Sequence, residues 1–195
     1  MSTRMPNVYG GGANTNVNGL KFEQTTSLDS TLVRKGFEII DNEVYYHDRK
    51  IGWSVGKNKL YTKFLTPQNI DYKQYNSKRW QPDECFINEL NQTAYIIEKK
   101  FQNSSGSVDE KLPGCHFKKM EYEKLFSPLG YKVQFIYIFN DWFEKDEYKD
   151  TKEYICMMGC SYFFYEIPLS VLGIDFLWKC EVINIRFKKG SIFFS

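Results

Sequence analysis

Three residues near the middle of the chain have side chains whose types and spacing suit metal-dependent chemistry: Asp83, Glu98 and Lys100. Asp83 follows Pro82 directly. Glu98 and Lys100 are separated by one residue, so on a strand they project to the same face. Two carboxylates beside an ammonium form a site for a hard divalent cation, because Mg²⁺ takes oxygen ligands and keeps several waters. The spacing predicts a metal site formed by Asp83 and Glu98, with Lys100 beside it.

Two strands and a turn must bring these residues together. Residues Tyr95–Ile97 form a short apolar run, which predicts a buried strand that ends in the charged residues. A second candidate strand spans residues 84–88, and a turn at residues 89–92 joins the two. A hairpin of these strands brings Asp83 near Glu98.

The rest of the chain supplies candidate core elements. Residues Tyr131–Phe139 are β-branched, aromatic and polar only at their start, which is typical of a central strand of a mixed sheet. Residues His116–Phe126 have a helical pattern, with Phe117, Met120 and Leu125 as its predicted buried stripe.

The N-terminal third predicts a helix and then strands. Asn18 is a plausible N-cap for a helix that runs to about Arg34 and carries Glu23 in its second turn. From Phe37 to Leu65 short β-rich runs alternate with turn residues, and the run at residues 59–65 is predicted to be one of these strands.

Basic residues lie between and around these runs. Such a scatter forms either a solvated surface or the phosphate-contacting side of a DNA cleft, and the sequence leaves both open. The residues concerned are Lys57, Lys59, Lys63, Lys73, Lys78 and Arg79.

The pair Pro82-Asp83 and Glu98-x-Lys100 resembles the active-site pattern of the PD-(D/E)XK nuclease superfamily, and within it the type II restriction endonucleases. Asn18 to Glu23 resembles the start of the family's first helix, which often carries an extra active-site glutamate. Residues 106–112 resemble the loop and helix that follow the motif strand in several restriction enzymes. These stretches cover roughly residues 14 to 126.

The resemblance implies a fold, a reaction and a set of roles. The fold is α/β (α+β), a restriction-endonuclease-like core with a central mixed β-sheet flanked by helices. The reaction is hydrolysis of double-stranded DNA at a short specific sequence by a homodimer, with one or two Mg²⁺ per active site. Asp83 and Glu98 would hold the metal, Lys100 would contact the attacking water and the scissile phosphate, and Glu23 and Gln102 would assist.

The chain is expected to form one domain over residues 1–195. Within it, residues 1–18 form a flexible Gly- and Asn-rich arm and residues 19–140 the catalytic core. Residues 141–195 are the candidate region for sequence specificity and dimer contacts. The candidate DNA-binding side chains are basic: Lys111, Lys118, Lys119, Arg186, Lys188 and Lys189.

Charge and composition limit the remaining choices. The net charge of +2 neither supports nor excludes a nucleic-acid partner, because an acidic metal site offsets a local basic face. Five cysteines without a CxxC pair favour reduced thiols in a cytoplasmic protein, and no membrane segment is expected. Three other functions remain open: a structure-specific or repair nuclease, a cleaving subunit of a heteromeric nuclease, and a non-catalytic DNA-binding module.

Overall fold

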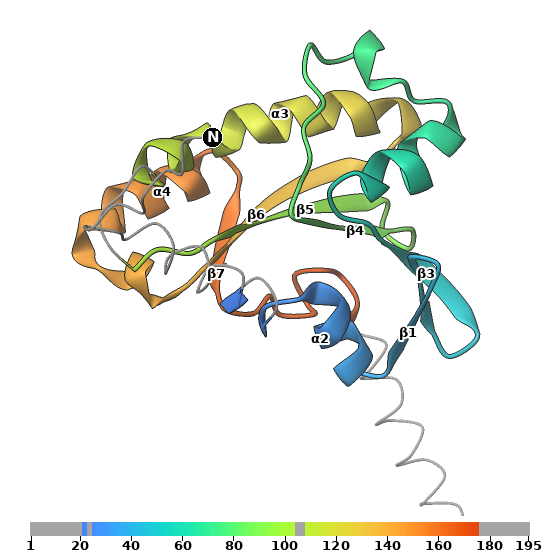
Figure 1. The fold of residues 1–195 in the computed structure, drawn as a ribbon, viewed down its shortest axis with the longest axis horizontal. Helices are drawn as coiled ribbons and strands as arrows, with labels where there is room; N and C mark the ends of the chain where they lie inside the picture. The colour runs from blue at the N-terminus through green and yellow to red at the C-terminus, as the bar shows by residue number, and fades with distance from the viewer. Residues whose placement is uncertain (1–20, 23–24, 104–107, 176–195) are drawn as a thin grey trace, which may run out of the picture.

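The computed structural model describes residues 21–22, 25–103 and 108–175, which form one seven-stranded mixed sheet with helices on both faces (Figure 1). The strands lie side by side in chain order. Strands β1 to β5 pair antiparallel, whereas β5 pairs parallel with β6, and β6 with β7. The strands are β1 (Phe37–Ile40), β2 (Glu43–Tyr46), β3 (Arg49–Ser54), β4 (Glu84–Asn88), β5 (Thr93–Lys100), β6 (Lys132–Phe139) and β7 (Ser161–Phe164).

Helices α3 (Cys115–Phe126) and α4 (Lys149–Met157) lie on one face of the sheet, and α2 (Leu28–Arg34) lies on the other (Figure 1). This arrangement confirms the predicted mixed sheet flanked by helices. Among the described residues, no helix is both long and apolar enough to cross a bilayer. The remaining helical turns are η1 (Leu60–Leu65), η2 (Thr66–Gln68), η3 (Tyr72–Gln74), η4 (Asp109–Gly114), η5 (Ser127–Leu129), η6 (Asp141–Glu144) and η7 (Asp146–Tyr148).

The central strands β4, β5 and β6 are apolar on both faces, because helices cover both sides. Cys85 and Ile96 point into the cluster of buried side chains that includes α3 and α4. Phe86 and Ile97, their neighbours in sequence, belong to the cluster that includes α2. The predicted strands at residues 84–88 and 131–139 are therefore confirmed as core strands.

Two predictions for the N-terminal half were wrong. Residues Leu60–Leu65 form a π-helix, because Leu60, Tyr61, Phe64 and Leu65 recur at helical spacing and are all buried. The helix expected from Asn18 to Arg34 is interrupted. Its second part, α2, begins after Ser27, whose hydroxyl accepts a hydrogen bond from the backbone N–H of Ser30.

The predicted buried stripe of α3 was also wrong at two of its three positions. Phe117 is 49% exposed and Met120 is 37% exposed, whereas Leu125 is buried. The helix instead buries the face that carries Cys115 and Tyr122 against β6 and its neighbours. This rotation brings the face that carries Lys118 toward the sheet.

The close approach of β3 to β4 depends on a glycine, which yields a first prediction. A Cβ atom added to Gly52 would lie 1.9 Å from the carbonyl oxygen of Ile87, so the backbone must shift. We expect Gly52→Ala to lower the free energy of unfolding by about 1–3 kcal/mol, in the range of overpacked core sites. Urea unfolding followed by circular dichroism measures the change.

Gly114→Ala is the matched control, because a Cβ there meets nothing within 4 Å. It should change the unfolding free energy by less than about 1 kcal/mol, the scale of an N-cap effect. Equal unfolding free energies for the two variants would show that β3 and β4 tolerate a wider separation.

Candidate active site

The β4–β5 hairpin places Asp83 opposite Glu98. Glu84 pairs with Ile97 in the antiparallel register, so the preceding residue, Asp83, lies across from the following one, Glu98. The backbone N–H of Lys99 donates a hydrogen bond to Oδ2 of Asp83 at 2.7 Å, which fixes this carboxylate at the end of β5. The hairpin predicted from the sequence therefore brings the two carboxylates to the same end of the sheet.

Glu98 lies between two lysines that come from different elements. Lys100 Nζ, from the same strand, is 2.8 Å from Oε2 of Glu98, and Lys118 Nζ, from α3, is 2.9 Å from the same oxygen. The other oxygen, Oε1, has no hydrogen-bond partner within the described part of the chain. Glu98 is only 6% exposed, so its charge is neutralised almost entirely by these two ammonium groups.

These contacts shift the protonation equilibrium of Glu98. Burial alone raises the pKa of a carboxyl group, but the charges and hydrogen bonds of Lys100 and Lys118 outweigh it, so the pKa of Glu98 is lowered. The group is therefore ionised at neutral pH and is a competent oxygen ligand.

Strand alternation separates the two consecutive lysines of β5. Lys100 shares the α3 face with Glu98, and its ammonium lies 5.8 Å from the centre of the Tyr137 ring. Lys99 points to the α2 face, where its Nζ is 2.9 Å from Oε1 of Glu84. Lys99 is thus held in a separate buried ion pair, on the face of the sheet opposite Glu98 and Lys100.

Glu84 has a structural environment on the α2 face. Its carboxylate accepts hydrogen bonds from the backbone N–H of Leu28 at 3.1 and 3.2 Å, at the start of α2. Burial raises the pKa of Glu84, and the charge of Lys99 only partly opposes this effect. Glu84 therefore joins the start of α2 to β4, and its ion pair with Lys99 joins β4 to β5 on the same face of the sheet.

A hollow of about 340 Å³ lies beside Asp83, and residues on the loop after β3 form one of its walls. The backbone N–H of Lys57 donates to the carbonyl of Pro82 at 2.8 Å, which joins this loop to the chain before Asp83. A Cβ atom on Gly56 would lie 2.5 Å from the carbonyl oxygen of Asp83. The absence of a side chain at Gly56 therefore lets the loop pack against Asp83.

Gln102 lies just beyond the end of β5. Its backbone N–H donates to Oδ1 of Asn140, and its carbonyl accepts from Nδ2 of the same residue. The side chain is buried, and neither its Oε1 nor its Nε2 has a hydrogen-bond partner in the described residues. The Asn140 contacts fix its backbone, and its predicted role in the site stays a prediction.

The other predicted site residues are placed as follows. Lys118 contacts Glu98 as described. Lys119 donates to the carbonyl of Gly159 at 3.0 Å, and Lys111 is exposed on η4. Four predicted residues lie outside the described part of the chain: Glu23, Arg186, Lys188 and Lys189.

The sequence interpretation missed that Lys118 contacts the carboxylate of the motif. A signal existed, because Cys115, Lys118 and Tyr122 are spaced three and four residues apart and so share one helix face. The prediction took the more apolar Phe117 and Met120 as the buried stripe, and it therefore placed Lys118 on the solvent-exposed face of the helix. Phe117 instead packs edge-on against Trp80, with ring centres 5.8 Å apart.

The donor groups suit a hard divalent cation. Within residues 21–22, 25–103 and 108–175, no three His, Cys, Asp or Glu side chains are grouped for metal binding. Asp83 and Glu98, which the hairpin register places opposite each other, are the ligands predicted from the sequence. Mg²⁺ is commonly held by one or two carboxylates and completes its shell with water. Two carboxylates on facing strands, one with an unbonded oxygen, meet that requirement.

Comparison with known proteins identifies the family of this arrangement. The family model of the PD-(D/E)XK nuclease superfamily domain matches residues 16–125, more than half of the 195 residues. No curated protein and no solved structure matches the chain. The matched segment includes β4, β5 and nearly all of α3, the elements that carry Asp83, Glu98, Lys100 and Lys118.

The lowered pKa of Glu98 yields a prediction for stability. A carboxylate with a lowered folded-state pKa stabilises the fold above its unfolded pKa, about 4.3 for glutamate, and loses this effect as the pH falls through the folded-state value. We expect Glu98→Gln to reduce the unfolding free energy at pH 7 by about 1–3 kcal/mol, the scale of charge-assisted hydrogen bonds.

Urea unfolding of both proteins between pH 7 and pH 3 checks this expectation. The deficit of Glu98→Gln should shrink only once the pH is below about 4.3. The matched control is Glu123→Gln, because Glu123 is exposed on α3 and its contact with Lys119 is long, at 3.9 Å. A deficit that is the same at all pH values would contradict the assigned ion pairs.

Proposed function

Because the chain belongs to the PD-(D/E)XK nuclease superfamily, we propose that it is a Mg²⁺-dependent endonuclease that cuts double-stranded DNA at a short specific sequence, as type II restriction endonucleases do. The observation that carries this proposal is the placement of Asp83 opposite Glu98, with Lys100 bound to Glu98. A degenerate scaffold that only binds DNA has no need for this set of charges. Their retention favours catalysis over a non-catalytic binding module.

Asp83, Glu98 and Lys100 would have different roles in phosphodiester hydrolysis. Water attacks phosphorus, the bond to the leaving oxygen breaks, and that oxygen takes up a proton. Asp83 and Glu98 would hold one or two Mg²⁺, which supply Lewis-acid chemistry and lower the pKa of a bound water. Lys100 places a positive charge where negative charge develops on the phosphoryl oxygens.

Lys118 adds a second ammonium to the same carboxylate and comes from a different element. In the absence of a cation, Lys100 and Lys118 together compensate the charge of Glu98 in its buried position. If Asp83 and Glu98 held a divalent cation, the charge of Glu98 would depend less on Lys100 and Lys118. The lysines would then be released to contact the phosphate group of the substrate.

The symmetry of the proposed DNA target predicts the oligomeric state of the enzyme. A short palindromic site has two-fold symmetry, and a homodimer with one active site per strand matches it. Residues 141–195 remain the candidate region for dimer contacts and base readout. Their described part includes α4 and β7, at the edge of the sheet where β7 pairs only with β6 in the described residues.

Cleavage of DNA provides the direct test. The purified chain with Mg²⁺ and a panel of unmethylated double-stranded DNAs should give discrete fragments on a gel. Glu98→Ala should reduce the rate at least about 100-fold, the scale of losing a principal electrostatic contributor. Glu123→Ala, which removes an exposed glutamate of α3, should cut at the wild-type rate.

The alternatives give different patterns. A structure-specific or repair nuclease would cut junctions or flaps irrespective of sequence and would leave linear duplexes whole. A cleaving subunit of a heteromeric nuclease would cut only when its partner is supplied. Wild-type protein that cuts none of these substrates under any metal would contradict the proposal.

The geometry of Lys100 yields a further prediction. Arginine retains the charge but presents a planar fork in place of a compact ammonium, so it cannot take the same position between Glu98 and a phosphate. We expect Lys100→Arg to lower the cleavage rate at least about tenfold, or about 1.4 kcal/mol in barrier height. Single-turnover cleavage with enzyme in excess measures this step.

Lys63→Arg is the matched control, because Lys63 forms an exposed ion pair with Asp41 that either cation can make. Its cleavage rate should equal that of the wild type. A fully active Lys100→Arg variant would remove Lys100 from the catalytic role.

A further inference from the structure

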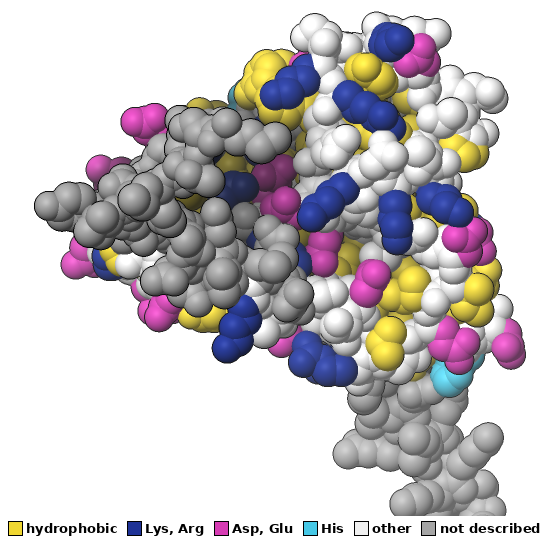
Figure 2. Space-filling view, viewed as in Figure 1, with side chains coloured by type: hydrophobic (Ala, Val, Ile, Leu, Met, Phe, Trp, Pro, Cys, Tyr) yellow, Lys and Arg dark blue, Asp and Glu magenta, His cyan; other side chains and the backbone are white. Residues whose placement is uncertain are grey.

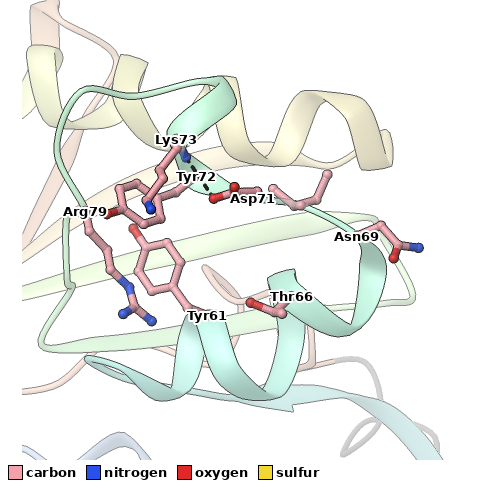
Figure 3. A pocket seen from close by; sticks show the side chains of 8 residues that line it. Tyr61, Thr66, Asn69, Asp71, Tyr72, Lys73 and Arg79 are labelled. Atoms are coloured by element: carbon pink, nitrogen blue, oxygen red, sulfur yellow. Dashed lines mark hydrogen bonds between the residues drawn. The ribbon is translucent and has the colours of Figure 1, made fainter.

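A second hollow lies on the α3 side of the sheet, between the helical turns η1 and η3 and the chain that leads to Asp83. Its volume is about 540 Å³, within the range of roughly 300–1,000 Å³ that small-molecule sites occupy. Figure 3 shows aromatic, basic and amide side chains around it. They include Tyr61, Tyr72, Lys73, Asn69 and Arg79.

Arg79 is the unusual member of this set. Its guanidinium lies 4.3 Å from the centre of the Tyr61 ring and 5.8 Å from that of Tyr72. Its Nε is buried and has no hydrogen-bond partner in the described residues. Guanidinium carries five N–H donors, so stacking on tyrosines orients this group but leaves its donors unmet.

The nearby carboxylate of Asp71 does not pair with the guanidinium of Arg79. Asp71 also lines the hollow, but its Oδ1 accepts the backbone N–H of Lys73 at 3.1 Å and so caps η3. In Figure 3 the carboxylate of Asp71 and the guanidinium of Arg79 lie on different sides of the Tyr61 ring, and among the described residues no ion pair joins them. A positioned guanidinium without a carboxylate suits an incoming anion, above all phosphate, whose geometry matches its fork.

Hydrogen bonds connect the hollow to α3, the helix that also carries Lys118. The Tyr61 hydroxyl donates to the carbonyl of Trp80 at 2.5 Å, and the Trp80 indole N–H donates to Oε2 of Glu121 on α3 at 3.2 Å. Arg79 precedes Asp83 by four residues, so their Cα atoms are at most about 14 Å apart. At about 3.4 Å per nucleotide along a strand, this separation spans at most about four nucleotides.

We propose that this hollow binds one nucleotide of the DNA strand near the scissile phosphate. Arg79 binds its phosphate, with Lys73 adding positive charge at the rim, and the half-buried ring of Tyr72 stacks on its base. The identification of the polymer as DNA rests on the proposed nuclease function. The contact is sequence-independent. It raises the affinity for DNA and positions the strand, whereas Asp83, Glu98 and Lys100 perform the chemistry.

The test measures binding without cleavage. A fluorescently labelled duplex and a labelled single strand of four nucleotides are titrated with protein in EDTA and followed by anisotropy. We expect Arg79→Gln to weaken binding of both probes about tenfold and to reduce the slope of log affinity against log salt concentration by about one. Arg34→Gln is the matched control, because it removes an arginine of α2, on the opposite face of the sheet, and should leave both values unchanged.

Two further variants separate binding from folding. Arg79→Lys keeps the charge but not the planar fork, so it should restore the salt slope and only part of the affinity. Tyr72→Leu should weaken binding of the four-nucleotide strand while leaving competition by inorganic phosphate unchanged. Thermal unfolding followed by circular dichroism identifies any variant that does not fold. If Arg79→Gln is unfolded, Arg79→Lys tests the role of Arg79 in nucleotide binding.

The outcomes distinguish this inference from the nuclease proposal. If Arg79→Gln and Arg34→Gln bind both probes as the wild type does, the hollow is not a nucleotide site, whether or not the protein cuts DNA. If the wild type binds through Arg79 in EDTA but cuts nothing with Mg²⁺, the nucleotide site stands and the cleavage proposal fails.

Discussion

The site depends on one buried charge, the carboxylate of Glu98. Burial of an ionised carboxyl group is unfavourable unless opposite charges compensate it. Lys100 and Lys118 do so from a strand and a helix, so the ion pairs hold α3 against the end of β5 as well as lowering the pKa of Glu98. The same contacts keep one carboxylate and two ammonium groups within hydrogen-bond distance of each other, the charges that the proposed phosphodiester hydrolysis would use.

Strand alternation gives β5 two charged faces. Glu98 and Lys100 point to the side of α3, and Lys99 points to the side of α2, where it pairs with Glu84. On the α2 face, Glu84 also accepts the backbone N–H of Leu28 and so holds the start of α2, whereas the Glu98–Lys100 pair lies in the candidate site on the α3 face. The consecutive lysines, which look equivalent in the sequence, have different roles because successive residues of a strand face opposite ways.

The β4–β5 hairpin was predictable because its signals are local. The apolar run before Glu98, the turn after Asn88 and the period-two spacing of Glu98 and Lys100 together fix which face each side chain occupies. The central strand β6 was predictable for the same reason. The orientation of α3 was not, because Phe117 is apolar but packs against Trp80, at the end of a long connection whose path no local pattern records.

The connection between β3 and β4 was the least predictable segment. Its run at residues 60–65 has the aromatic and β-branched residues of a strand, yet it forms a π-helix because its buried side chains must face the sheet from one side. The resulting turns place the rings of Tyr61 and Tyr72 beside the guanidinium of Arg79, and the Tyr61 hydroxyl donates a hydrogen bond to the carbonyl of Trp80. Positive charge is thus positioned close to an acidic site in a chain of net charge +2, where composition alone gives no indication of it. Helix α3 contacts both regions, through Lys118 at Glu98 and through Glu121 at Trp80, so one helix holds the end of β5 and the chain that leads to Asp83.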